Sequence, residues 1–171
     1  MMRPETSAFT GVWTVEDATL PDGRFAYDGR ITVQQLGDAH NLLWDISAGS
    51  YVGLGLTHAG HLFVSCGEHY AGLGVGLLQP DSAHGGFNLQ WTSLELNGAL
   101  GSGRLTPSDD ANGYEGVFQL IQRLPGGRLH GEWALVIERT GDIYRLDWHR
   151  SRALHMRGLG LPTPDGLAIG W

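Results

Sequence analysis

The chain has no lysine and only one cysteine, and only 17% of its 171 residues are charged. All eleven basic residues are arginine, and with eighteen acidic residues they give a formal net charge of −7. Surfaces that bind nucleic acid or anionic membranes need a basic stripe, yet residues 31–103 contain no arginine at all. The composition therefore predicts neither a nucleic-acid partner nor a membrane partner.

Other absences narrow the class of protein further. The single cysteine, Cys66, cannot form an internal disulfide. The N-terminal residues hold no apolar stretch of signal-peptide length, so we expect a cytoplasmic protein. No run of about 18 apolar residues is available for a membrane-spanning helix. Sustained helical periodicity is also nearly absent, which disfavours helical folds.

Glycine and turn dipeptides are abundant instead. The chain has 27 glycines, and short alternating runs are separated by turns such as Asp22-Gly23 and Asn112-Gly113. This spacing is typical of an all-β meander. We expect one domain over residues 1–171, an antiparallel up-and-down β-barrel with about 10 to 13 strands.

The sequence also repeats itself. Residues 11–13 (Gly-Val-Trp) reappear as residues 116–118 (Gly-Val-Phe), and residues 37–44 reappear as residues 141–148. The offset stays at 104 or 105 residues, and a shorter middle copy separates the two. The chain is therefore predicted to consist of three units: 9–69, 70–113 and 114–171.

Residues 53–56 and 158–161 both read Gly-Leu-Gly-Leu, and a period of two puts their glycines on one face and their leucines on the other. We assign the leucines of both copies to the core. Glycines in register on a strand imply the close approach of a neighbour. Either an aromatic ring covers the bare backbone, or the glycines form a groove or an oligomer contact.

Two resemblances follow from these motifs. Residues 11–13 resemble the Gly-x-Trp signature of the calycins (lipocalins and avidins), up-and-down barrels that hold small ligands. A broader pattern is similar to small Gly-rich bacterial β-barrel domains of unassigned role, some of them labelled fibronectin-binding. It is carried by residues 37–44, 53–56, 72–77 and 127–133. The resemblance implies a barrel and supplies no catalytic residues.

Side chains with catalytic or metal-binding chemistry are scattered. His58 and His61 flank a predicted turn, but two ligands are too few for a zinc site, so we predict no metal and no cofactor. Asp45 and His149 occupy equivalent repeat positions on a face expected to be solvated. No nucleophile accompanies a base and an orienting group, so the sequence favours a protein that is not an enzyme.

The third unit carries a basic cluster that the first unit lacks. Two readings stay open, a solvated charged loop or an anion contact made by arginine forks. The cluster consists of Arg150, Arg152, His155 and Arg157.

The function that fits these features best is non-catalytic binding of a small, largely apolar ligand in or at the mouth of the barrel. The residues expected to line the site are Trp44, Trp148, Trp91, Trp133, His40 and Tyr144. The alternative is a protein-interaction module with a filled barrel, which forms a homodimer through its Gly-rich surface. An internal cavity would distinguish the two functions.

Overall fold

The computed structural model describes residues 7–69 and 71–171, so Tyr70, the predicted start of the middle unit, lies outside the described residues. The described chain is built from β-strands, with one 3₁₀ turn, η1 (Leu94–Leu96), as its only helical element. The all-β prediction is confirmed.

Thirteen strands follow one another in the described chain. The first five are β1 (Gly11–Thr19), β2 (Phe25–Leu36), β3 (Ala39–Ile46), β4 (Gly49–His58) and β5 (His61–Gly67). The next three are β6 (Gly74–Pro80), β7 (Phe87–Ser93) and β8 (Gly101–Pro107). The last five are β9 (Gly116–Arg123), β10 (Leu129–Thr140), β11 (Ile143–Arg150), β12 (Ala153–Thr163) and β13 (Gly166–Gly170).

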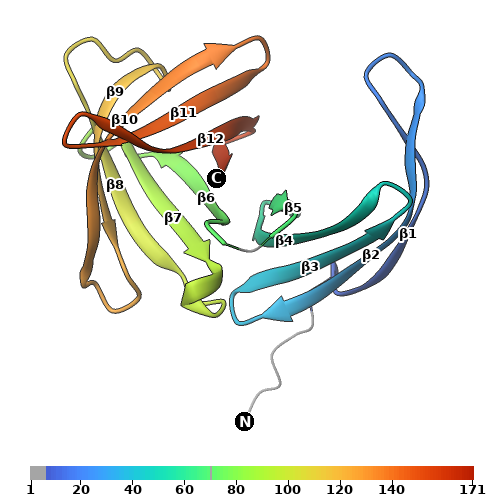
Figure 1. The fold of residues 1–171 in the computed structure, drawn as a ribbon. Coiled ribbons are helices and arrows are strands. Elements are labelled where there is room, and N and C mark those ends of the chain that lie inside the picture. Colours follow the sequence, from blue (N-terminus) through green and yellow to red (C-terminus); the bar gives the residue numbers. More distant parts are fainter. Residues whose placement is uncertain (1–6, 70) are drawn as a thin grey trace.

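The strands form two assemblies that lie side by side (Figure 1). Strands β6 to β13 close into an eight-stranded antiparallel barrel, in which β13 pairs with β6. Strands β1 to β5 form a separate curled sheet that does not close. The predicted up-and-down barrel is thus confirmed, but it closes with eight strands, because β6 pairs with β13 instead of with β5, the strand before it.

The sheet and the last five barrel strands pair in the same register. One row of directly opposed residues crosses three strands in each: Trp13, Ile31 and Trp44 in the sheet, and Phe118, Leu135 and Trp148 in the barrel. Strands β1 to β5 therefore have the pairing pattern of a partial barrel. They lack the three strands, β6 to β8, that complete the wall around β9 to β13.

Tryptophan rings cover glycines in both assemblies. A Cβ atom built on Gly101 would lie 2.5 Å from the ring of Trp91, and one built on Gly158 would lie 3.0 Å from the ring of Trp148. In the sheet, Trp44 covers Gly53 in the same way. At these positions glycine leaves room for a large ring on the inner face.

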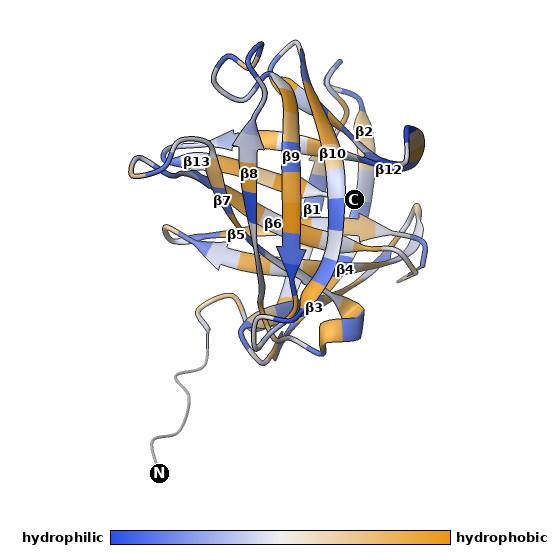
Figure 2. Cartoon of the chain, turned by 90° about the vertical axis from the view of Figure 1, so that its left-hand side faces the viewer, coloured by the Kyte–Doolittle hydropathy of each residue, from blue (hydrophilic) through white to orange (hydrophobic). Residues whose placement is uncertain are grey.

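The sheet docks on the outer wall of the barrel through its convex face. Leu54 and Leu56 of β4 are fully buried against Val75, Leu77 and Ala168. Their repeat equivalents in β12, Leu159 and Leu161, are exposed. The core assignment is therefore right for the first pair and wrong for the second, because no sheet covers the barrel wall at β12. Figure 2 shows hydrophobic segments on strands of both assemblies.

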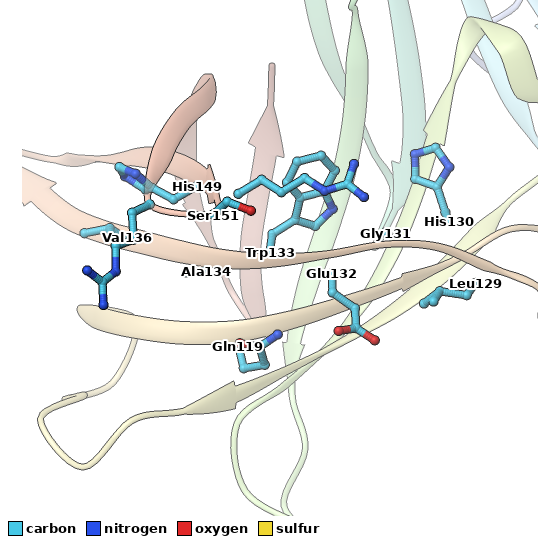
Figure 3. Close-up of a pocket in the computed structure, with 12 residues that line it drawn as sticks. Gln119, Leu129, His130, Gly131, Glu132, Trp133, Ala134, Val136, His149 and Ser151 are labelled. Carbon is cyan, nitrogen blue, oxygen red and sulfur yellow. The ribbon is translucent and has the colours of Figure 1, made fainter.

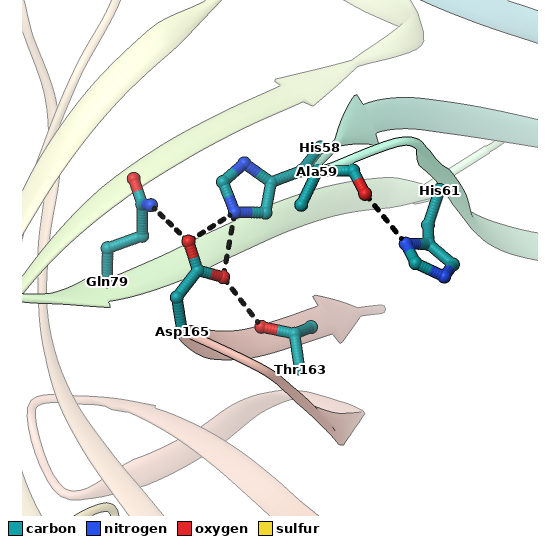
Figure 4. Close-up of polar contacts among 6 residues, drawn as sticks. All are labelled: His58, Ala59, His61, Gln79, Thr163 and Asp165. Atoms are coloured by element: carbon teal, nitrogen blue, oxygen red, sulfur yellow. Dashed lines mark hydrogen bonds and ion pairs between the residues drawn. The ribbon is translucent and has the colours of Figure 1, made fainter.

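A polar contact joins the hairpin between β4 and β5 to the hairpin between β12 and β13 (Figure 4). The Nε2 atom of His58 lies 2.8 Å from the Asp165 carboxylate, which also accepts hydrogen bonds from Gln79 and Thr163. His61 instead bonds the Ala59 carbonyl of its own turn at 3.0 Å. Among residues 7–69 and 71–171, no three His, Cys, Asp or Glu side chains gather closely enough to hold a metal ion.

This contact predicts a pH-dependent stability. The hydrogen bond from His58 holds the pKa of the Asp165 carboxyl below its ordinary value of 3.8. The stabilisation of the folded protein by this contact is therefore present above pH 3.8, and it is lost as the pH falls through the lowered pKa of Asp165. We expect His58→Phe to melt at a lower temperature than the parent at about pH 5, and the difference to shrink as the pH is lowered below 3.8, through the lowered pKa of Asp165.

The matched control is His61→Phe, because the hydrogen bond of His61 stays within its own turn and does not reach Asp165. Thermal melts followed by circular dichroism measure both variants. A difference between parent and His58→Phe that stays constant across this pH range would contradict the role of Asp165.

Candidate ligand site at the barrel mouth

Four tryptophan rings gather at one end of the barrel, which we call the mouth. They come from β7, β10, β11 and the residue that follows β13: Trp91, Trp133, Trp148 and Trp171. The ring of Trp171 lies 6.4 Å from that of Trp91 and 5.5 Å from that of Trp148, measured between centroids. At the opposite end, Phe87 and Tyr114 stack at 4.8 Å.

A cavity of about 540 Å³ opens among these rings. Its wall includes Trp91, Gln122, Trp133, Arg150, Met156 and Trp171, and residues 71–73 and 93–95 form part of its rim. A more open hollow of about 840 Å³ adjoins it and shares His130, Trp133 and Arg150 (Figure 3). Trp133 and His130 lie on one side of β10, and Glu132 lies on the other.

The indole N–H of Trp133 has no hydrogen-bond partner within the described part of the chain, although its side chain is only 8% exposed. The neighbouring Trp91 differs, because its Nε1 donates to the Ser102 carbonyl at 3.1 Å. A buried donor without an acceptor costs about 1–3 kcal/mol. Trp133, whose ring lines the cavity, thus holds a buried donor over Gly131 for which the described residues supply no acceptor.

Positive charge and imidazole rings surround this donor. The Arg150 guanidinium lies over the Trp133 ring at 5.6 Å, and no carboxylate of the described residues forms an ion pair with it. The ring of His155 lies 4.9 Å from Trp133, and the ring of His130 lies 5.0 Å from Trp91. Glu95 lines the same cavity and Glu132 lines the adjoining hollow, but neither forms an ion pair with Arg150. An anionic group could therefore still form a charge-assisted hydrogen bond with this arginine.

The structure brings only some of the six predicted ligand residues together. Trp91 and Trp133 line the cavity, and Trp148 lies fully buried beneath it, against Trp171. Tyr144 lies toward the other end of the barrel, with its ring 5.8 Å from that of Tyr114.

The other two predicted residues, Trp44 and His40, belong to the five-stranded sheet and not to the barrel. His40 is buried with its ring 6.4 Å from that of Phe9. Neither ring nitrogen has a hydrogen-bond partner among the described residues, and burial lowers the pKa of this imidazole. His40 is therefore a neutral, enclosed side chain at about pH 7.

The four residues of the basic cluster do not all lie at the same site. Arg150 and His155 line the mouth cavity, whereas Arg152 lines only the outer hollow. Arg157 forms an ion pair with Asp147, at 3.3 Å between Nε and Oδ1.

Several residues of the site were not predicted as ligand contacts, among them Gln122, His130, Met156 and Trp171. Gln122 is buried, and counting in steps of two from Phe118 along β9 would have placed it inside the barrel. His130 lies at the register shift between Leu129 and Gly131, where β10 pairs with β9, and the sequence carries no signal for that shift.

No protein-family model, curated protein or solved structure matches this chain. The resemblances to calycins and to Gly-rich bacterial domains therefore stay predictions, and the candidate site stands on its geometry. In the described residues, no helix has the length and apolar character needed to cross a membrane.

Proposed function

We propose that the barrel mouth binds a small, planar, largely apolar ligand that carries an acidic group, without catalysing a reaction on it. The observation that carries the proposal is an aromatic cavity lined by Trp133, whose buried indole N–H has no partner among the described residues, with Arg150 over its ring and in no ion pair with a described carboxylate.

The size and the wall of the cavity fit such a ligand. Its volume of about 540 Å³ is within the range of small-molecule sites. Trp91 and Trp133 offer ring faces for offset or edge-to-face contacts with a planar group. An acidic oxygen would accept a hydrogen bond from the Trp133 indole and a charge-assisted bond from Arg150. These contacts orient the ligand with its acidic group toward the rim.

The test uses 8-anilinonaphthalene-1-sulfonate, a planar aromatic anion whose fluorescence reports binding. We expect micromolar binding by the parent and about tenfold weaker binding by Arg150→Gln, which is a loss of ~1.4 kcal/mol. Arg152→Gln is the matched control, because Arg152 does not line the mouth cavity, and it should bind as the parent does.

Two results would contradict the proposal. One is equal binding by Arg150→Gln and the parent. The other is a loss of binding caused by a substitution in the five-stranded sheet, such as Trp13→Asp, while Arg150→Gln still binds. Either result would place the probe elsewhere on the molecule.

A second function, self-association, is supported by a separate surface. The inner face of the five-stranded sheet is apolar and open.

A further inference from the structure

The inner, concave face of the five-stranded sheet forms an apolar hollow of about 340 Å³, which we call the trough. It is lined only by apolar residues, among them Trp13, Ile31, Leu42, Trp44, Leu62 and Val64. The convex face of the same sheet is already covered by the barrel. The trough is therefore the face of this sheet that residues 7–69 and 71–171 leave open.

The repeat equivalents of the trough residues form the interior of the barrel. Trp13 is 50% exposed, whereas Phe118 at the same register position in β9 is 1% exposed. Val64 is 36% exposed, whereas Ile169 in β13 is 2% exposed. The trough thus has the side chains of a barrel interior, but the wall that would enclose them is missing.

Both edges of the sheet are also unpaired in the described structure. Strand β1 pairs only with β2, and β5 pairs only with β4. Unpaired strand edges are sites for strand addition. Beside β5, a further hollow of about 360 Å³ includes Val64 together with the exposed Leu159 and Leu161 of the barrel wall. An added strand at β5 would cover these leucines.

We propose that a second copy of this chain covers the trough, so that two five-stranded sheets close one ten-stranded barrel between them. In a meander with an odd number of strands, β1 and β5 run in the same direction. A two-fold axis perpendicular to the barrel axis places β1 antiparallel to β1 of the second copy, and β5 antiparallel to its β5. This self-complementary arrangement satisfies both edges at once.

The area of the trough fits a protein partner better than a small ligand. Five strands span about 24 Å and an eight-residue strand is about 26 Å long, so one face covers roughly 600 Å² before the edges are counted. A stable dimer buries about 800 Å² per partner. A small molecule in the trough would stay exposed to solvent along the open side. The lining carries no charge, so two acidic chains can meet there without direct repulsion.

The test compares the oligomeric state of three proteins by sedimentation equilibrium over a range of concentrations. The parent should be a dimer. Trp13→Asp should weaken the dimer by about 100-fold or more, because it places a charge in the shared interior. Val12→Asp is the matched control on the convex side of the same strand, where the side chain is 66% exposed, and it should remain a dimer.

Val64→Asp is the second trough variant, and it should also be monomeric. Far-UV circular dichroism and probe binding at the barrel mouth check that each variant is folded. A parent that is monomeric up to high concentration overturns the proposal, and so does a dimer that survives both trough substitutions. The mouth lies on the barrel and the trough lies on the five-stranded sheet. The dimer proposal can therefore fail its test while the ligand proposal passes, and the reverse.

Discussion

Replacing Trp148 with alanine is expected to lower the free energy of unfolding by about 3–5 kcal/mol. The ring is fully buried in the barrel, lies over Gly158 and has its centroid 5.5 Å from that of Trp171. The neighbouring strands are held by a closed ring of pairings, so they cannot collapse into the cavity that alanine would leave. Urea unfolding at equilibrium measures the loss.

The matched variant is Trp44→Ala, at the equivalent position of the sheet. Trp44 covers Gly53 as Trp148 covers Gly158, but its other side faces the open trough. In the monomer we expect a cost of only about 1–2 kcal/mol, because part of the ring already contacts solvent. Equal losses of unfolding free energy at low protein concentration would show that the two rings are equally enclosed. That result would contradict the difference in burial between the barrel interior and the open sheet.

Gly160→Val should destabilise the protein by about 1–3 kcal/mol through overpacking. A Cβ atom at Gly160 would lie 2.9 Å from Leu167 and 3.1 Å from Leu146, both of which are fully buried in the barrel. At the equivalent Gly55, a Cβ atom would lie 2.9 Å from Leu62, whose side chain lines the open trough and can move aside.

The expected cost of Gly55→Val is therefore smaller, below about 1 kcal/mol in the monomer. Thermal and urea unfolding of the two variants measure the difference. A larger cost at Gly55 than at Gly160 would contradict the open trough.

The strand pairing of the repeat units followed from period two and turn spacing, but the choice of partner for β6 did not. Strands β5 and β13 are repeat equivalents, so the local pattern allows either to pair with β6. Trp171, which covers Gly74 and exchanges two backbone hydrogen bonds with it, favours β13. Its repeat equivalent is the much smaller Cys66, which lies within β5. This difference between distant residues favours closure of the barrel with β13.

The sequence also predicted only part of the candidate site. Trp91 and Trp133 followed from two copies of the repeat, in which they occupy matching positions of an alternating run. Tyr144 was grouped with Trp148 because both face inward, but four residues along a strand span about 13 Å, and this separates them along the barrel axis. Trp44 and His40 match Trp148 and Tyr144 in the repeat, which predicts one shared barrel, whereas the described chain forms two assemblies.

The most direct test of the ligand site uses the six tryptophans as reporters of position. Each gives its own indole N–H signal in a ¹⁵N-resolved nuclear magnetic resonance spectrum, and single Trp→Phe variants assign them. On addition of 8-anilinonaphthalene-1-sulfonate, the signal of Trp133 should shift most, because its free N–H lies in the cavity wall, and the signals of Trp13 and Trp44 should stay in place. Shifts at Trp13 and Trp44 with an unchanged Trp133 would contradict the account.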